Sequence, residues 1–551
     1  PLIVDMSTLR GDTYLNIEDA HLKVTGNVHA NAFKLGLVEV VPGYSLASAT
    51  NVGNTTSQTV QFTNTDTSFV ASSNVEIGKT LKITNDTDAA NIYVDVSTSG
   101  EIVSNVWSLP SKIYPNDPEL TSEFGSGCAI SDDGNYMVIA DHTKNETVYN
   151  QGAAYVYKWN GTVWTQQTKL LPDAESDQEF GFSFGFGFIE NVNSTIAITS
   201  DGSKIVVGAN EKDETTTRQG VVYVYTRTNE TWSAATKITG ENEATSFFGV
   251  NVDISADGNY IIAGAPRKNQ ASDDEGAAYI YRWTGSSWSQ YTKIVSQDED
   301  NAYFGSSVAI NSDGTRVVVG ANGKNEATVA SGDDQGAVYI FDRTGTNTWG
   351  TYTNKITTGD DGGVDDFFGT CVDISADGRY IIVGSPNDTI NGTAVIDHQG
   401  SAFIFKKVGG SLWEQQAKLV GKPEQNAHFG CSVKLSSDGT KALIGSRSED
   451  VNENDQGAAY LYTRTGETWG EKTRFVGDSK YNGQFGTSCG ITSNGSTLLI
   501  GARYEGVAYV FTRGDRNDST LNVSKSVHVT ENVTLGKTLK ITNEYDSSNL
   551  V

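Results

Sequence analysis

Acidic residues occur in short runs along the middle of the chain, and carboxylates in such runs could hold a cation or recognise a ligand. The runs comprise Asp273, Asp274, Glu275, Asp298, Asp300, Asp333, Asp334, Asp360, Asp361, Asp365 and Asp366. Acidic runs of this kind are also typical of solvated loops. The sequence therefore offers them as a candidate ligand-binding surface and leaves the solvated alternative open.

A second candidate surface is a segment in which phenylalanines alternate with small residues. It contains Phe182, Phe184 and Phe186. Exposed aromatic rings could stack on a sugar or a protein partner. The same residues could instead form a bulged strand that packs against itself.

Residues suited to catalysis are sparse by comparison. A glycosidase would need paired carboxylates that converge on one cleft, usually beside clustered arginines. The six histidines are scattered, and arginines recur at turns, as at Arg227, Arg343 and Arg464. We therefore expect no enzymatic activity and keep a propeller glycosidase only as an alternative.

The elements that must position these residues are β-strands. The chain has 58 glycines, 24 tyrosines, 21 phenylalanines and only 2 methionines, which is typical of an all-β protein. A formal charge of −27 disfavours nucleic acid as a partner. No apolar run is long enough to predict a membrane span.

An internal repeat organises these strands. A Phe-Gly pair occurs seven times, and most copies are followed by Ile, an Asp-Gly hairpin turn and three further short strands. The pairs begin at Phe124, Phe180, Phe248, Phe304, Phe368, Phe429 and Phe485. Four strands in each repeat predict the blades of a seven-bladed β-propeller.

The two ends of the repeat array complement each other. A Trp-bearing fourth strand is missing after the seventh copy, near Arg513, whereas Trp107 and Lys112 stand alone before the first copy. Pairing of these ends would close the ring and leave no open sheet edge, unlike the alternative open solenoid. We expect the propeller at 105–514, with tight turns on one face and the long acidic connections on the other.

Phe-Gly, Ile-Ser-x-Asp-Gly and Ala-Gly-Ala-Pro together resemble the FG-GAP repeat of integrin-α-like propellers. This resemblance implies adhesion or ligand binding, with calcium in some loops of the family. The hairpin Ser255–Gly258 lacks the alternating Asp ladder that calcium needs, so we expect no cofactor and no metal.

Two flanking regions, 1–104 and 515–551, carry a different repeat. Apolar pairs recur every six residues, as at Val527 and Val529, and Gly78–Asn85 repeats the sequence of Gly536–Asn543. These regions are similar to β-structured fibre repeats in virion proteins of large algal DNA viruses. Such thin segments should pack against copies of themselves, which predicts a homotrimeric stalk.

These features favour a virion surface fibre or decoration protein whose propeller attaches to a host glycan or protein receptor, or to other coat or stalk proteins. An extracellular adhesion or matrix protein is the alternative. Sequons suited to a surface glycoprotein include Asn145, Asn160, Asn387 and Asn391. Arg10-Gly-Asp12 could mimic an integrin ligand, although a chance tripeptide explains it as well.

The four cysteines lack metal-ligand spacing, and each closely follows a Phe-Gly pair. Buried free thiols account for this pattern. Cys128 and Cys489 occupy the same register in blades that ring closure makes neighbours, so a disulfide between them stays open at this point.

Overall fold

A computed structural model describes 76–77, 81–83, 92–94, 107–119, 121–183, 193–270, 273–296, 302–325, 334–345, 348–358, 363, 365–390, 398–478, 480–513, 527–529 and 533–534. The chain divides into two compact units. One unit is 108–513, and the other combines 1–107 with 514–551.

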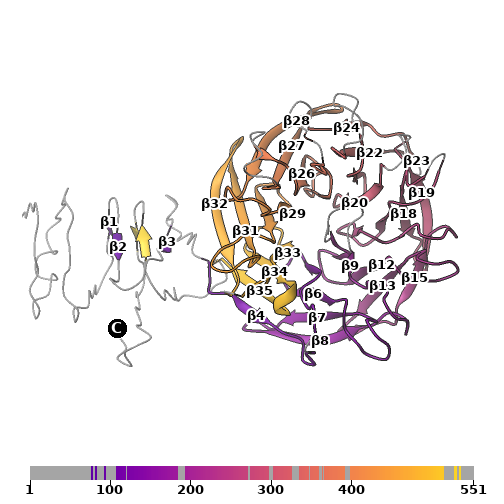
Figure 1. Cartoon of the computed structure of the whole chain (residues 1–551), viewed down its shortest axis with the longest axis horizontal. Coiled ribbons are helices and arrows are strands. Elements are labelled where there is room, and N and C mark those ends of the chain that lie inside the picture. Colours follow the sequence, from indigo (N-terminus) through magenta and orange to yellow (C-terminus); the bar gives the residue numbers. More distant parts are fainter. Residues whose placement is uncertain are drawn as a thin grey trace, which may run out of the picture. The chain divides into compact units, whose positions relative to one another are not determined.

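The larger unit is a ring of seven antiparallel sheets, as predicted (Figure 1). Blade one contains β5 (Cys128–Ile130), β6 (Tyr136–Asp141), β7 (Ala153–Trp159) and β8 (Trp164–Leu170). Blade two contains β11 (Ile196–Ile198), β12 (Lys204–Ala209), β13 (Val221–Thr228), β14 (Thr231–Trp232) and β15 (Thr236–Thr239). Blade three contains β16 (Val252–Ile254), β17 (Tyr260–Ala265), β18 (Ala277–Trp283) and β19 (Trp288–Ile294).

Blades four to six follow the same antiparallel order. Blade four contains β20 (Phe304–Ile310), β21 (Arg316–Ala321), β22 (Ala337–Gly345), β23 (Thr348–Trp349) and β24 (Asn354–Ile356). Blade five contains β25 (Cys371–Ile374), β26 (Tyr380–Ser385), β27 (Ser401–Gly409) and β28 (Leu412–Val420). Blade six contains β29 (Phe429–Leu435), β30 (Lys441–Ser446), β31 (Ala458–Thr465) and β32 (Thr468–Val476). Among the described residues no helix combines the length and hydropathy of a membrane span.

The seventh blade closes the ring with a strand from the other end of the repeat array. Its strands are β33 (Phe485–Ile491), β34 (Thr497–Ala502), β35 (Val507–Thr512) and β4 (Ser111–Ile113). Ile113 pairs with Ala508 and Lys112 with Tyr509, and the Ser108 amide donates to the Thr512 carbonyl at 2.9 Å. The predicted closure by the Trp107–Lys112 segment is therefore confirmed.

Each Phe-Gly pair lies at the junction between two blades. The Phe248 ring is fully buried and meets Tyr279 edge-on at 5.5 Å. Gly249 has φ of +87°, and its amide donates to Gly264 of its own blade at 2.8 Å. Its carbonyl lies so close to Gly208 of the preceding blade that a Cβ there would approach it to 1.9 Å. Glycine is thus required on both sides of this junction.

The same backbone contact recurs around the ring. A Cβ at the second-strand glycine of blades three to seven would come within 1.9–2.1 Å of the next Phe-Gly carbonyl. The last of these glycines, Gly501, faces Gly125 of the first blade at 2.0 Å, whereas blade one has Ala140 at the corresponding position. The junction that joins the last blade to the first is therefore built like those from blade two onward.

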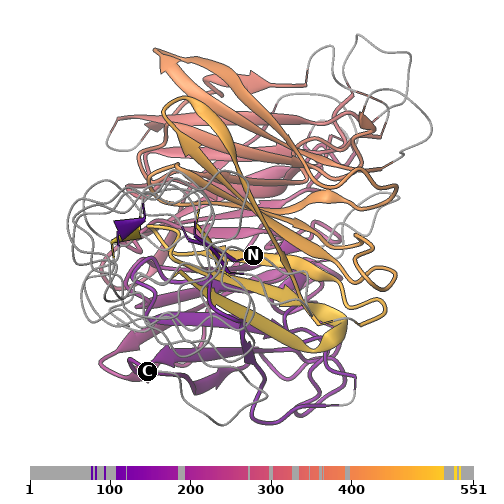
Figure 2. The ribbon, with the colours of Figure 1, turned by 90° about the vertical axis from the view of Figure 1, so that its left-hand side faces the viewer.

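The smaller unit contains strands from both flanking regions. β36 (Val527–Val529) pairs antiparallel with β2 (Leu81–Ile83) and parallel with β3 (Ile92–Val94), and β1 (Glu76–Ile77) pairs with β37 (Val533–Thr534). Figure 2 shows the same ribbon from the side. The remaining stalk residues, Arg10-Gly-Asp12 included, lie outside the described residues.

The glycine contacts at the blade junctions predict that two glycine substitutions differ strongly in their effect on the stability of the fold. Gly430→Ala places a Cβ 2.2 Å from the Ser401 carbonyl at φ of +94°, whereas a Cβ at Gly470 in β32 meets nothing within 4 Å. We expect Gly430→Ala to lower the free energy of unfolding by about 3 kcal/mol or more and Gly470→Ala to change it by about 0.5 kcal/mol or less. Urea unfolding of both variants measures this, and equal stability of the two would contradict the junction.

Candidate binding surfaces of the propeller

The two faces of the ring carry different connections. The hairpin face holds the turns between first and second and between third and fourth strands, and the loop face holds the other connections. On the hairpin face, Asp257 accepts hydrogen bonds from the Ser255 hydroxyl at 2.6 Å and the Asn259 amide at 3.0 Å. This carboxylate therefore stabilises its own turn.

Most charges of the loop face form ion pairs within the chain. In the first blade the Lys144 ammonium, buried behind the loop, lies 2.7 Å from Glu119 and 3.2 Å from Asp117. Asp117 also accepts from Lys169 of the fourth strand at 2.8 Å. These lysines lower the pKa of Asp117, although burial opposes them as the largest single effect.

The same pairing recurs in the third blade and, with its polarity reversed, in the fifth. In the third blade Lys268 and Lys293 hold Glu241 at 3.4 and 2.9 Å. In the fifth blade the buried partner is an acid, Asp388, which lies 2.8 Å from Lys418. The basic residue that follows a Trp in the sequence is therefore one half of an ion pair on the loop face in six cases: Lys112, Lys169, Lys237, Lys293, Lys418 and Arg474.

The structure places the predicted acidic residues in three situations. Asp273 and Asp365 are exposed, Asp334 is half-buried, and Asp274 accepts a hydrogen bond from Arg267 at 2.9 Å. Glu275 and Asp366 are buried and therefore cannot contact a ligand directly, which corrects the sequence prediction for these two. Asp298, Asp300, Asp333, Asp360, Asp361, Phe184, Phe186 and Asn391 lie outside the described residues.

Sequence reasoning missed a buried glutamine that orders the loop face. Gln219 accepts from the Thr215 amide at 3.1 Å and donates to the Glu241 carbonyl at 3.2 Å. It thereby ties the loop before the third strand to the connection into the next blade. The signal was present as a Gln-Gly or Glu-Gly dipeptide before each third strand, and Glu275 occupies this position in the third blade.

Phe182 is fully buried, so it supplies no exposed stacking surface, contrary to the candidate site. It begins β9 (Phe182–Ser183), which pairs with β10 (Asn193–Ser194) in the second blade. Its ring stacks on His142 at 4.2 Å and lies 5.1 Å below the guanidinium of the fully buried Arg503. The phenylalanine-rich insertion therefore packs at least this residue inward.

Four ionisable side chains from three blades meet beneath Phe182. His142 lies 3.6 Å from Glu123 and 3.9 Å from Glu179, and Arg503 lies 3.4 Å from Glu123. Burial, then the charges of Glu211 and Glu123, raise the pKa of Glu179 to about 8. Burial and Arg503 lower the pKa of His142 to about 3. Glu179 is therefore largely protonated at neutral pH in the folded protein.

The raised pKa of Glu179 predicts that the stability of two glutamate variants depends differently on pH. Between its usual pKa near 4.5 and its folded value near 8, Glu179 binds a proton in the folded state only, so stability falls as pH rises. The slope is at most about 1.4 kcal/mol per pH unit. Glu179→Gln should remove this slope, whereas Glu453→Gln, at an exposed loop position, should keep it. Urea unfolding from pH 5 to about 8 measures the difference, and parallel curves for all three proteins would refute it.

The central channel contains a cavity of about 140 Å³ lined by first strands of the blades. This is well below the roughly 300–1,000 Å³ of sites for drug-sized ligands. Asp253 accepts from the Ile310 amide at 2.8 Å, and Asp373 accepts from the Leu435 amide at 2.7 Å. These carboxylates thus satisfy inner-strand amides that face the channel.

Charges in the channel compensate one another. Lys434 lies 3.5 Å from Asp373, and although burial lowers the pKa of Lys434, attraction to Asp373 and Asp253 outweighs it and the pKa is raised. Burial raises the pKa of Asp253 to about 6. At the hairpin end Asp132 accepts from the Ser437 hydroxyl at 3.1 Å and from Ser200. The channel charges therefore hold neighbouring blades together.

The cysteines, one of the predicted glycosylation sites and one serine motif are buried. All four cysteines are free, so Cys128 and Cys489 are not bridged, and burial raises the pKa of Cys128 to about 12. Asn145 and Asn160 are exposed, but Asn387 is 5% exposed and cannot receive a glycan in the folded protein. Ser488 lies in a Gly-x-Ser-x-Gly pattern typical of hydrolases, yet it is buried and donates to the Gly125 carbonyl at 2.9 Å.

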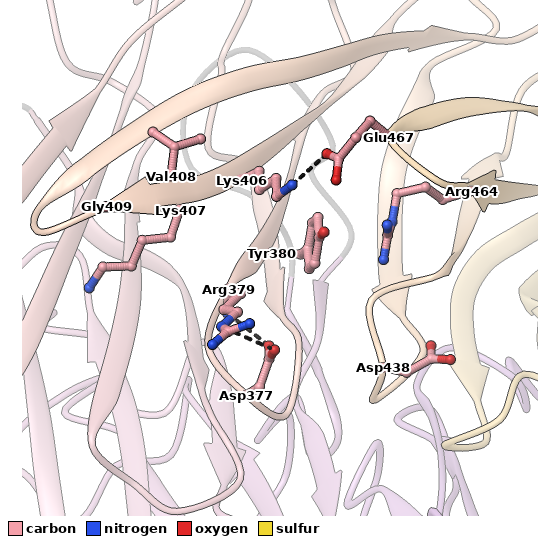
Figure 3. Close-up of a pocket in the computed structure, with 10 residues that line it drawn as sticks. All are labelled: Asp377, Arg379, Tyr380, Lys406, Lys407, Val408, Gly409, Asp438, Arg464 and Glu467. Carbon is pink, nitrogen blue, oxygen red and sulfur yellow. Dashed lines mark hydrogen bonds and ion pairs between the residues drawn. The ribbon is translucent and has the colours of Figure 1, made fainter.

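The larger cavity, about 720 Å³, is a groove on the hairpin face between blades five and six (Figure 3). Tyr380 lies in it, with the Arg464 guanidinium 4.4 Å from its ring. Lys406 donates to Glu467 at 2.5 Å across the groove. Arg379 and Lys407 complete its basic lining. Sequence reasoning identified none of these as site residues.

Comparison with protein families finds the FG-GAP repeat at 107–157, 232–281, 288–341, 351–405 and 413–462. The protein is thus a seven-bladed β-propeller containing FG-GAP repeats, which confirms that part of the predicted resemblance. The comparison with curated proteins finds no match.

Two solved structures are similar to part of this chain. The Cps50 (Swd1) β-propeller domain of Myceliophteria thermophila is 9% identical, with 73% of this chain and 99% of that chain covered and a TM-score of 0.46. Hydrazine synthase of Kuenenia stuttgartiensis is 13% identical at the same coverage and TM-score.

Proposed function

We propose that the protein is a non-enzymatic binding protein of an extracellular or virion surface, in which the propeller attaches to a glycan or protein receptor. The observation that carries this proposal is a set of exposed tyrosines on the loop face. Tyr114, Tyr149, Tyr481 and Tyr504 are 53%, 67%, 68% and 37% exposed. All four come from connections that enter, leave or lie within blades seven and one.

Exposed tyrosines suit recognition because each combines a large apolar ring with a hydroxyl group and has little rotamer entropy to lose. The ion pairs and buried glutamines hold the connections that carry them in place. A rigid ring that presents aromatic side chains on ordered loops supports binding without requiring chemistry. Oxygen-rich partners such as glycans and protein loops fit this surface.

The finer proposal is a virion fibre or decoration protein that forms a homotrimer through its flanking repeats and contacts other coat proteins. The hexad pattern and the pairing of β36 with β2 and β3 support it, because both flanking regions contribute to one unit. The alternative is a cellular adhesion protein, which the FG-GAP repeats favour equally. A trimeric mass of the full chain in solution is expected, and a monomer would remove the stalk from the proposal.

The binding proposal predicts a loss of affinity on removing two tyrosine rings. On a glycan array and in pull-downs with surface proteins, the full chain should bind at least one ligand without converting it. Tyr149→Ala combined with Tyr481→Ala should weaken that binding at least about tenfold, since aromatic anchors typically contribute about 2 kcal/mol or more.

Val163→Ala is the matched control, because Val163 is 54% exposed but lies on the hairpin face. It should bind as tightly as the unmodified chain. Equal affinity of the double tyrosine variant would remove the loop face as the binding surface. Turnover of a bound glycan, lost on changing one carboxylate, would favour the glycosidase alternative instead.

A further inference from the structure

The groove on the hairpin face has two counterparts in the same chain, because blades alternate in pairs. The second strands of blades one, three and five begin with Tyr136, Tyr260 and Tyr380. Each tyrosine ring lies beneath an arginine of the next blade, at 4.1, 4.8 and 4.4 Å respectively. Three equivalent sites therefore exist at the blade junctions 1/2, 3/4 and 5/6.

Backbone hydrogen bonds fix the equivalence of two further positions. The Trp159 amide donates to the Asn135 carbonyl at 2.8 Å, and the Trp283 amide to the Asn259 carbonyl at 2.9 Å. At the third site the Lys407 amide donates to the Arg379 carbonyl at 2.9 Å. The fifth blade thus replaces an Asn with Arg379 and a Trp with Lys407.

These replacements remove a ring pair from the third site. Trp159 packs against Trp164 at 5.5 Å, and Trp283 against Trp288 at 5.4 Å. Lys407 instead extends its side chain beside the groove (Figure 3). The 720 Å³ groove, the larger of the two described cavities, occurs at this junction.

The replacements also change the charge of the site. Across six equivalent positions the first two sites each carry two cations and two carboxylates, whereas the third carries four cations and two carboxylates. Glu467, which also lines the third site, and Glu230, which pairs with the equivalent lysine in the first, add one carboxylate each. The three sets are Asp133, Asn135, Lys158, Trp159, Asp201 and Arg227; Asp257, Asn259, Arg282, Trp283, Asp313 and Arg343; Asp377, Arg379, Lys406, Lys407, Asp438 and Arg464. A local excess of cations in a chain of net charge −27 favours an anionic ligand.

The two added cations form only long ion pairs within the chain, and the Lys407 side chain is 20% exposed. The Arg379 side chain is 72% exposed, and its nearest carboxylate is Asp377 at 3.7 Å. Lys407 lies 3.6 Å from Asp342. Neither distance is that of a normal hydrogen bond, so a ligand anion would gain charge-assisted hydrogen bonds here.

The remaining lining indicates what carries the anion. Asp377, Asp438 and Glu467 supply acceptors for hydroxyl groups and would repel a polyanion such as nucleic acid. Tyr380 is only 7% exposed and lies beneath Arg464, so it helps to form the floor of the groove and offers no free stacking face. A ligand that donates hydroxyl groups and carries one or two negative charges fits this lining, and an acidic sugar has both features.

We propose that the groove between blades five and six binds an acidic oligosaccharide, with Arg379 and Lys407 contacting its carboxylate or sulfate group. This proposal goes beyond the proposed function, because it assigns a second binding site to the hairpin face. The loop-face tyrosines and the groove are on opposite faces of the ring, so variants of one leave the other intact.

The test is calorimetric titration of the full chain with sialyllactose, sulfated lactose and neutral lactose. Binding of at least one charged sugar at least tenfold tighter than lactose, weakening as salt is raised, is expected. The preferred charged sugar identifies the anionic group as carboxylate or sulfate. Equal or absent binding of all three sugars would overturn the proposal.

The decisive variant is Arg379→Asn combined with Lys407→Trp, which gives the groove the residues that the other two sites hold in the same fold. It should fold, with an unchanged circular dichroism spectrum and melting temperature, and lose at least tenfold in affinity for the charged sugar. Arg282→Gln, at the junction of blades three and four, is the matched control and should bind normally. Retained affinity in the double variant, or an equal loss in Arg282→Gln, would overturn the assignment; loss of binding in the tyrosine variant alone would instead place the sugar on the loop face.

Discussion

Close contact between glycine backbones at six of the seven blade junctions is the constraint on which the propeller depends. The Gly249 carbonyl occupies the space that a side chain of Gly208 would fill, and its φ of +87° is one that glycine adopts without strain. Most junctions also satisfy that buried carbonyl. The Ser432 hydroxyl donates to Gly486 at 2.8 Å, and Ser488 does so to Gly125 across the closing junction at 2.9 Å. Blades held this closely fix the positions of all the connections on both faces.

Many of the acidic residues that give the chain its negative charge form ion pairs at these junctions. Acids in the connections between blades lie beside buried lysines such as Lys144 and Lys268, so much of the acidic loop face is internally compensated. Free acids alone therefore do not define a binding surface here. Exposed aromatic residues on one face and a local excess of cations on the other are the features that remain for recognition.

The fold was predictable from the sequence because the Phe-Gly period, the Asp-Gly turns and the unpaired Trp107 segment are local patterns with one consistent closure. The site was less predictable. Glu275 reads as part of an acidic loop, yet it occupies the buried position that Gln219 has in the preceding blade. The sequence left open whether Phe182 is exposed or self-packed, and it is Arg503 and His142, which lie far from it in sequence, that pack against its ring. Such outcomes depend on which loops adjoin, and a single sequence does not give that directly.

The alternation of two blade types cannot be regular all the way around a ring of seven blades. Three Tyr/Arg pairs account for six blades, and an odd-numbered ring leaves one blade over, so perfect alternation cannot close upon itself. The seventh blade starts its second strand with Thr497 and lies against the first. The alternation of blade types is therefore broken at the seventh blade. Arg503 is buried there, and the exposed tyrosines of blades seven and one lie nearby on the loop face. A ring of similar blades thereby has one blade, the seventh, that breaks the alternation, so a ligand can distinguish one position on the ring from the others.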